Sequence, residues 1–204
     1  MSSPTFLSLA RTALTALCLV VSHAFASSVL QQPIETLIEE SPLVFEGKVT
    51  AIRTESTGKR VYTWITLDVL DVIKGDYADD QIALRYLGGT AGGVTMRVSD
   101  QTMPAHGEQG IYFMESLDTR TVHPLKGWGQ GHFILDRDPT RGEYVVRNSE
   151  GKVVTGLSRE KQPRPNALNA KSAGGVTTAE RGAQESQAAM TRETFKAFIQ
   201  EVSR

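Results

Sequence analysis

Residues 61–74 form the longest alternating stretch of this chain and constrain its fold more than any other segment. The more apolar positions recur at every second residue, at Thr63, Ile65, Leu67 and Val69. A period of two is typical of a strand with one buried face. The apolar set then continues at Leu70, and this change of phase predicts a β-bulge near Val69. The stretch is about twice the usual strand length, which favours a small closed barrel over a flat sheet.

Further strands are predicted on both sides of this stretch. The sequence predicts them at residues 43–54, 81–87, 94–98 and 110–117, with weaker ones at 132–136, 143–147 and 152–155. Gly47 is expected to mark a bulge or bend in the first of them. Ile34, Leu37 and Ile38 recur at helical spacing before Pro42, which predicts a short amphipathic helix. We therefore expect a mainly β domain over residues 27–155.

The N-terminus has the pattern of a secretory signal peptide over residues 1–26. Arg11 precedes the apolar run 12–21, and Ala24 and Ala26 supply the small residues that signal peptidase reads. A retained membrane anchor is disfavoured, because the uncharged run between Arg11 and His23 covers only residues 12–22. A membrane-spanning helix needs about 20 apolar residues. A lipid anchor is disfavoured as well, because Leu17 stands where a lipobox has a small residue. The processed chain is therefore expected to have no membrane span.

The cysteine count and the net charge limit which cellular compartment and which class of partner are expected. Cys18 is the only cysteine, so a chain processed after Ala26 has none and cannot form a disulfide. This is ordinary for a bacterial envelope protein of this length, and we expect a secreted or periplasmic location. Without Arg11 the chain has 21 basic and 23 acidic residues, since the whole chain has 22 and 23, and its formal charge is −2. Nucleic-acid binding is therefore not expected.

Beyond residue 155 the composition changes. Residues 156–190 show little apolar periodicity and contain Pro163, Pro165 and the pair Gly174–Gly175, so a disordered linker is predicted. The segment 191–204 has apolar residues at helical spacing, with Thr191 as a candidate N-cap. It is expected to form an amphipathic helix that docks on the domain, because so short a helix is marginal alone.

No catalytic constellation, metal site or cofactor motif is recognisable. His106, His123 and His132 are 17 and 9 residues apart, which matches no paired-ligand motif, and isolated histidines are the simpler interpretation. The Gly-x-Ser-x-Gly elbow of a serine hydrolase does not occur, and the processed chain has no thiol. The segment 88–93 lacks the ending of a phosphate-binding loop. We therefore expect a protein that is not an enzyme and has no cofactor.

Two glycine-rich segments are candidate partner-binding loops. The first contains Gly88, Gly89, Gly92 and Gly93, and a flexible turn is its default interpretation. The second, residues 127–131, sets Trp128 and Gln130 among three glycines. An aromatic side chain on such a loop can anchor a partner, although Trp128 can equally cover one end of the barrel.

Several of these segments occur together in a known family. They are Gly47–Thr50, Val72–Asp76, Gly88–Gly93, Gly107–Glu108 and Gly129–Phe133. In this order the chain resembles a group of uncharacterised bacterial secreted proteins whose domain is similar to the OB-fold of tissue inhibitors of metalloproteinases and netrin modules. The resemblance covers residues 33–136. Its most specific element is the Lys74–Asp76 segment after a long strand.

The resemblance implies a five-stranded Greek-key barrel with extra hairpins and a protein partner, such as a secreted protease. The animal inhibitors chelate the catalytic zinc through an N-terminal cysteine, which this chain lacks after processing, so that mechanism does not transfer. We expect a non-enzymatic binding module. The alternatives are an envelope enzyme or accessory subunit with an unrecognised active site, and a structural surface protein. The oligomeric state is not predicted.

Overall fold

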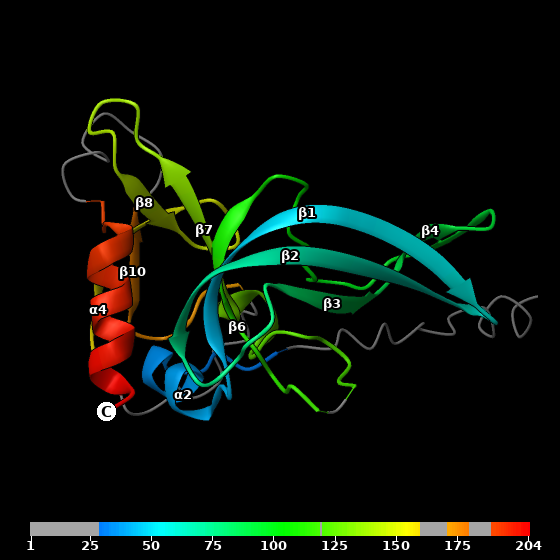
Figure 1. The fold of residues 1–204 in the computed structure, drawn as a ribbon, viewed down its shortest axis with the longest axis horizontal. Helices are drawn as coiled ribbons and strands as arrows, with labels where there is room; N and C mark the ends of the chain where they lie inside the picture. Colours follow the sequence, from blue (N-terminus) through cyan, green and yellow to red (C-terminus); the bar gives the residue numbers. More distant parts are fainter. Residues whose placement is uncertain (1–28, 119, 160–170, 180–188) are drawn as a thin grey trace, which may run out of the picture.

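The computed structural model describes residues 29–118, 120–159, 171–179 and 189–204, and the fold is mainly β (Figure 1). The predicted signal peptide and its cleavage site lie outside the described residues. The helices are α2 (Ile34–Glu40), the short 3₁₀ helix η2 (Trp128–Gly131) and α4 (Arg192–Val202). The strands are β1 (Val44–Thr57), β2 (Arg60–Lys74), β3 (Gln81–Leu87), β4 (Gly89–Ala91), β5 (Val94–Met96), β6 (Gln109–Phe113), β7 (His132–Arg137), β8 (Tyr144–Arg147), β9 (Val153–Leu157) and β10 (Val176–Ala179).

Eight strands form one antiparallel sheet in the order β10-β9-β8-β7-β6-β1-β2-β3. Strands β1, β2 and β3 follow one another, and β6 returns to lie beside β1, which is the Greek-key arrangement. The mainly β prediction is confirmed. The sheet is not closed, however, because β3 and β10 stand at its two ends, so the predicted barrel is not confirmed.

The long hairpin of β1 and β2 bends where the sequence changes phase. Gly47 pairs with Val69 and Glu46 with Asp71, so Leu70 is the extra residue of a bulge, as predicted. The bulge turns Leu70 outward, and its side chain is half exposed rather than part of the apolar set. The two strands arch away from the rest of the sheet, with β4 beside their far end (Figure 1).

The sheet is buried on both faces where β1 and β6 meet, because neighbouring residues enter two different hydrophobic clusters. Val44 and Phe113 belong to the cluster that includes α2 and α4. Phe45 and Tyr112 belong to the cluster enclosed by β1, β2, β3 and β6. Alternation along each strand therefore supplies two cores, one on each face.

The Lys74–Asp76 segment connects the C-terminal end of α2 to the end of β2. Lys74 Nζ donates to the carbonyl oxygens of Ile38 at 2.5 Å and of Glu39 and Ser41, both at 2.8 Å. These carbonyls have no partner within the short helix, so the ammonium group caps them. A Cβ at Gly75, whose φ is +90°, would lie 2.2 Å from the carbonyl oxygen of Pro42. The most specific element of the sequence pattern thus has a structural role.

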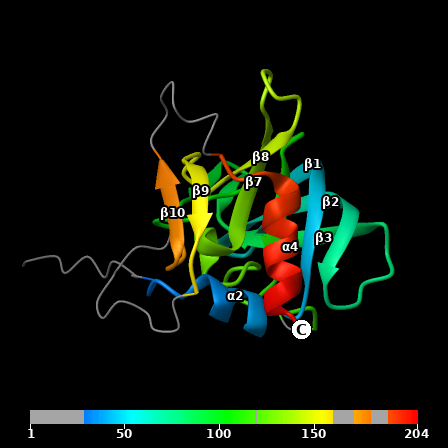
Figure 2. The same cartoon turned by 90° about the vertical axis from the view of Figure 1, so that its left-hand side faces the viewer.

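The C-terminal helix docks as predicted, with α2 near its C-terminal end (Figure 2). The Thr191 side chain accepts a hydrogen bond from the backbone N–H of Thr194 and caps α4. Arg192 and Lys196 both form ion pairs with Glu46, whose side chain is buried on β1. A buried carboxylate requires such partners, so these pairs hold α4 against the sheet.

Two segments differ from the sequence prediction. Val176–Ala179, predicted as part of a disordered linker, form β10, which pairs with β9 at the edge of the sheet. Residues 160–170 and 180–188 of that linker lie outside the described residues. Gly89–Ala91 and Val94–Met96 form a separate hairpin rather than a flexible loop and a strand of the main sheet. Within the described residues, no helix is long and apolar enough to cross a membrane.

Candidate functional site

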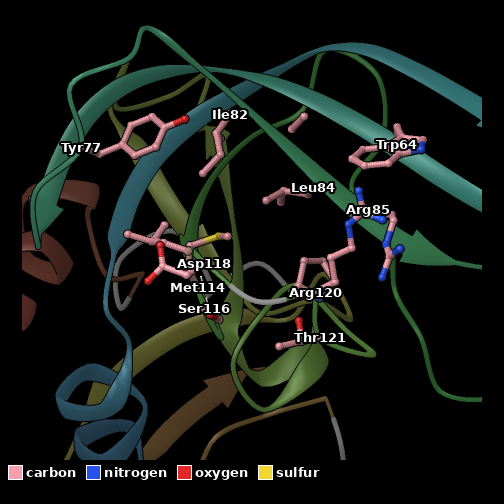
Figure 3. Close-up of a pocket in the computed structure, with 13 residues that line it drawn as sticks. Trp64, Tyr77, Ile82, Leu84, Arg85, Met114, Ser116, Asp118, Arg120 and Thr121 are labelled. Atoms are coloured by element: carbon pink, nitrogen blue, oxygen red, sulfur yellow. Dashed lines mark hydrogen bonds between the residues drawn. The ribbon is translucent and has the colours of Figure 1, made fainter.

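A groove of about 400 Å³ lies between β3 and residues 114–118 and 120–124, which we call the facing segment (Figure 3). Ile82 and Leu84 line it from β3, and Met114 lines it from the facing segment. The side chains of Ile82 and Leu84 also belong to the cluster enclosed by the sheet. The groove thus runs along the edge of the sheet beside side chains of the apolar core, and Leu117, which is 41% exposed, adds apolar surface to it.

The backbone of β3 points into this groove at every second residue. Val69 N–H donates to the carbonyl of Asp80 at 2.8 Å, and Gly88 N–H donates to that of Val61 at 2.7 Å. In an antiparallel pair the hydrogen-bonded residues alternate with residues whose backbone groups point away. Counting between these two bonds, Ala83 and Arg85 direct both their N–H and their C=O groups away from β2. Both residues line the groove.

The two ends of this edge are satisfied by side chains. Tyr77 Oη donates to the carbonyl of Gln81 at 2.9 Å, and Gln101 Nε2 donates to that of Leu87 at 2.8 Å. Between them, no described residue forms a hydrogen bond with the outward backbone groups of Ala83 and Arg85. The central part of the edge is therefore open.

Aromatic side chains on β2 organise the charged end of the groove. The Arg85 guanidinium lies 4.7 Å from the centre of the Tyr62 ring. Trp64, which also lines the groove, donates from Nε1 to Glu55 at 2.7 Å. These contacts hold the arginine and the indole in place before any ligand arrives.

The groove carries cations toward one end and an anion toward the other. Arg85 and Arg120 line it near Trp64, whereas Asp118 and Tyr77 lie toward the opposite end of the view (Figure 3). Burial, followed by the charge of Asp79, raises the pKa of Tyr77, so that its hydroxyl stays protonated and keeps donating. The arrangement suits a ligand with a negative group at the arginine end.

A second set of polar groups is buried inside the sheet. His132 Nε2 donates to Glu108 Oε1 at 2.7 Å, and the His132 ring stacks on Tyr112 with centroids 5.2 Å apart. His123 meets Tyr86 edge-on at 5.0 Å and stacks on Trp128 at 5.1 Å. We call these six residues the buried tyrosine–histidine cluster.

Four polar atoms of the buried tyrosine–histidine cluster have no hydrogen-bond partner among the described residues. They are the hydroxyls of Tyr86 and Tyr112, His123 Nε2 and His132 Nδ1. Burial lowers the pKa of His123 to about 4. Burial and the charge of Glu108 raise the pKa values of both tyrosines, so the phenols stay neutral. The two histidines are only 3% and 1% exposed, so a substrate in solution does not reach them.

The first predicted loop belongs to a different groove. Gly88 and Gly89 line a depression of about 430 Å³ next to the β4–β5 hairpin, and Gly92 and Gly93 form the turn of that hairpin. A Cβ at Gly89, whose φ is +123°, would lie 2.5 Å from Thr63 Oγ1. Glycine is thus required there for the close approach of the hairpin to β2.

The second predicted loop packs against the protein's own chain. Gln130 is 1% exposed, and its side chain accepts from the N–H of Gln32 at 2.7 Å and donates to the carbonyl of Leu30 at 2.9 Å. Gln130 therefore fixes the segment before α2, whereas the sequence pattern indicated a candidate partner-binding residue. Trp128 is half-buried by its stacking on His123, which agrees with the covering role considered for it. It is not among the residues lining the depression at Gly88.

The three histidines occupy separate environments. His106 is exposed and lies 3.1 Å from the carbonyl of Thr50, whereas the other two are buried in the cluster described above. In the parts of the chain that the structure describes, no three His, Cys, Asp or Glu side chains lie together as a metal-binding group.

The sequence reasoning did not find the groove or the buried cluster. Ala83 and Arg85 are the outward positions of a correctly predicted strand, but nothing local shows that this strand lies at an edge. The cluster joins residues from β3, β6, η2 and β7 and from the segments before β6 and η2, and their proximity has no sequence signal.

Comparison of the chain with protein-family models, with curated proteins and with solved structures found no match. The relationship to tissue inhibitors of metalloproteinases and netrin modules therefore stays a prediction from the sequence.

Proposed function

We propose that this protein is a non-enzymatic binding module, secreted or periplasmic, that recognises a protein partner at the groove along β3. One observation carries the proposal: the outward backbone groups of Ala83 and Arg85 are open in a groove that also offers apolar side chains and arginines. Backbone donors and acceptors next to apolar surface are what another polypeptide satisfies best.

The position of the reactive side chains supports binding rather than catalysis. The side chains best suited to general acid or base catalysis are the histidines and tyrosines of the buried tyrosine–histidine cluster. They are at most 3% exposed. A general acid or base must come within hydrogen-bond reach of its substrate. The groove along β3 instead presents arginines, an indole and aliphatic side chains, which are typical of recognition surfaces.

Site-specific photo-crosslinking tests this proposal. A photoreactive amino acid replaces Leu117, which lines the groove and is 41% exposed, or Leu70, which is 50% exposed on the bulge of β2 and serves as the matched control. The full chain is irradiated in its producing cells, and crosslinked proteins are identified by mass spectrometry. One protein should crosslink from position 117 but not from position 70, and its purified form should bind the chain saturably.

Two results would overturn the proposal. One is the failure of every purified candidate to bind saturably. The other is turnover in a broad hydrolase screen that a single substitution in the buried tyrosine–histidine cluster abolishes, because this would make the protein an enzyme.

A further inference from the structure

We propose that the partner binds by adding an extended segment to β3 as a ninth strand of the sheet, with an acidic side chain beside Arg85 and Arg120. This inference rests on the proposed function, because it specifies how a protein partner occupies the groove. The chemical class of ligand is a short unpaired peptide strand with an acidic residue followed by an apolar one.

The backbone geometry sets where the added strand pairs. Ala83 and Arg85 each direct one donor and one acceptor outward, so an antiparallel segment forms two hydrogen-bonded residue pairs with them. At the ends of β3 the carbonyls of Gln81 and Leu87 already accept side-chain hydrogen bonds, which limits pairing to the centre. Exposed edge strands are often protected by proline or a bulge, and β3 has neither.

Alternation along the strand then sets the side chains of the ligand. The peptide residue paired with Arg85 projects to the same face as Arg85, because directly opposite residues share a face. Arg120 lines the same groove, so an acidic residue is favoured at this position. The next peptide residue lies opposite Leu84 and projects toward Leu84 and Met114, which favours an apolar side chain.

A second copy of this chain is a poorer occupant. Residues 114–118 and 120–124 provide the other wall of the groove, so the edge of another sheet would have to displace them (Figure 3). A second β3 would also place no acidic side chain opposite Arg85, because Gln81–Leu87 contains none. The arginine end of the groove would therefore gain no charge complement from such pairing.

The first test uses the full chain and the capped probe Thr-Thr-Glu-Val-Thr-Thr, with binding measured by fluorescence anisotropy. Glutamate is placed opposite Arg85 and valine opposite Leu84. N-methylation of the glutamate amide removes a hydrogen bond to β3 and should weaken binding at least about tenfold. N-methylation of the valine amide, which points away from β3, is the matched control and should change binding less than about threefold.

The second test exchanges charges. The Arg85→Glu variant should no longer bind the glutamate probe and should bind a probe that has lysine in place of glutamate. The control Arg60→Glu changes an exposed residue at the tip of the β1–β2 hairpin and should leave the binding of both probes unchanged. Ala83→Pro removes an outward N–H that does not bond β2, so the variant should unfold in urea as wild type does while losing the probe. If that variant unfolds early, the N-methylated probes still decide the question.

Three outcomes contradict strand addition. The first is that the probe does not bind at concentrations up to about 1 mM. The second is that the two N-methyl groups weaken binding equally. The third is that the wild type forms a dimer which Arg85→Glu or Ala83→Pro dissociates, because this would assign the edge to a second copy. If the crosslinked partner binds Ala83→Pro as tightly as wild type, strand addition is wrong and the proposed function stands. If no partner crosslinks from position 117, the proposed function itself fails.

Discussion

Acidification should destabilise the fold through one residue, His123. Its ring lies between Tyr86 and Trp128, and its Nε2 has no partner among the described residues. Protonating the ring places a positive charge in an apolar site, with His132 nearby as a second source of repulsion. The folded protein therefore resists protonation that the unfolded chain accepts readily.

The pKa of His123 gives the size of this effect. Burial lowers the pKa from 6.5 to about 4. Between these values the unfolded state binds more protons, so the free energy of unfolding falls as the pH falls from about 6.5 to about 4. A difference of about 2.5 pKa units corresponds to about 3 kcal/mol, because one unit is worth about 1.4 kcal/mol. Above pH 6.5 this contribution is fully present.

Urea unfolding at pH 7, 6, 5 and 4 measures it. Wild type is compared with His123→Phe, which keeps an aromatic ring between Tyr86 and Trp128 but does not titrate. Carboxylates titrate in both proteins and cancel in the difference. The loss of stability between pH 7 and pH 4 should be smaller by about 3 kcal/mol in the variant. An identical pH dependence in wild type and His123→Phe would refute the reasoning.

Three further substitutions test the interior, each by urea unfolding at pH 7. Glu46→Gln leaves the two cations of α4 without their buried partner and should cost about 3 kcal/mol; no loss would mean that the ion pairs do not hold α4. Gly75→Ala places a Cβ 2.2 Å from the Pro42 carbonyl oxygen at a φ of +90° and should cost at least about 2 kcal/mol, and a neutral result would contradict the close approach. Tyr112→Phe removes a buried hydroxyl without a partner and should change stability by less than about 1 kcal/mol, whereas a larger loss would reveal a hydrogen bond to it.

The sequence predicted the local structure well. The strands at residues 60–74 and 81–87 and the bulge at Leu70 follow from alternation with a period of two. The helix α4 follows from its helical spacing and its cap at Thr191. Each of these features depends on neighbours within a few residues, and such patterns are visible in a single chain. Strand β10 was missed, because its four residues show no alternation of their own and are ordered by pairing with β9.

By itself, the sequence determined the long strands β2 and β3, the bulge at Leu70 and the helix α4, but it placed the end of β6 at residue 117 instead of Phe113 and did not show β10. Only the tertiary structure decided that β3 is an edge, that residues 114–118 and 120–124 face it, and that Gln130 is buried against Leu30 and Gln32 rather than exposed. These features depend on contacts between residues far apart along the chain. Hydrophobic periodicity indicates which face of a strand is buried, but it does not indicate which strands lie beside that strand. The edge of β3 is open because no described strand pairs with its outer side.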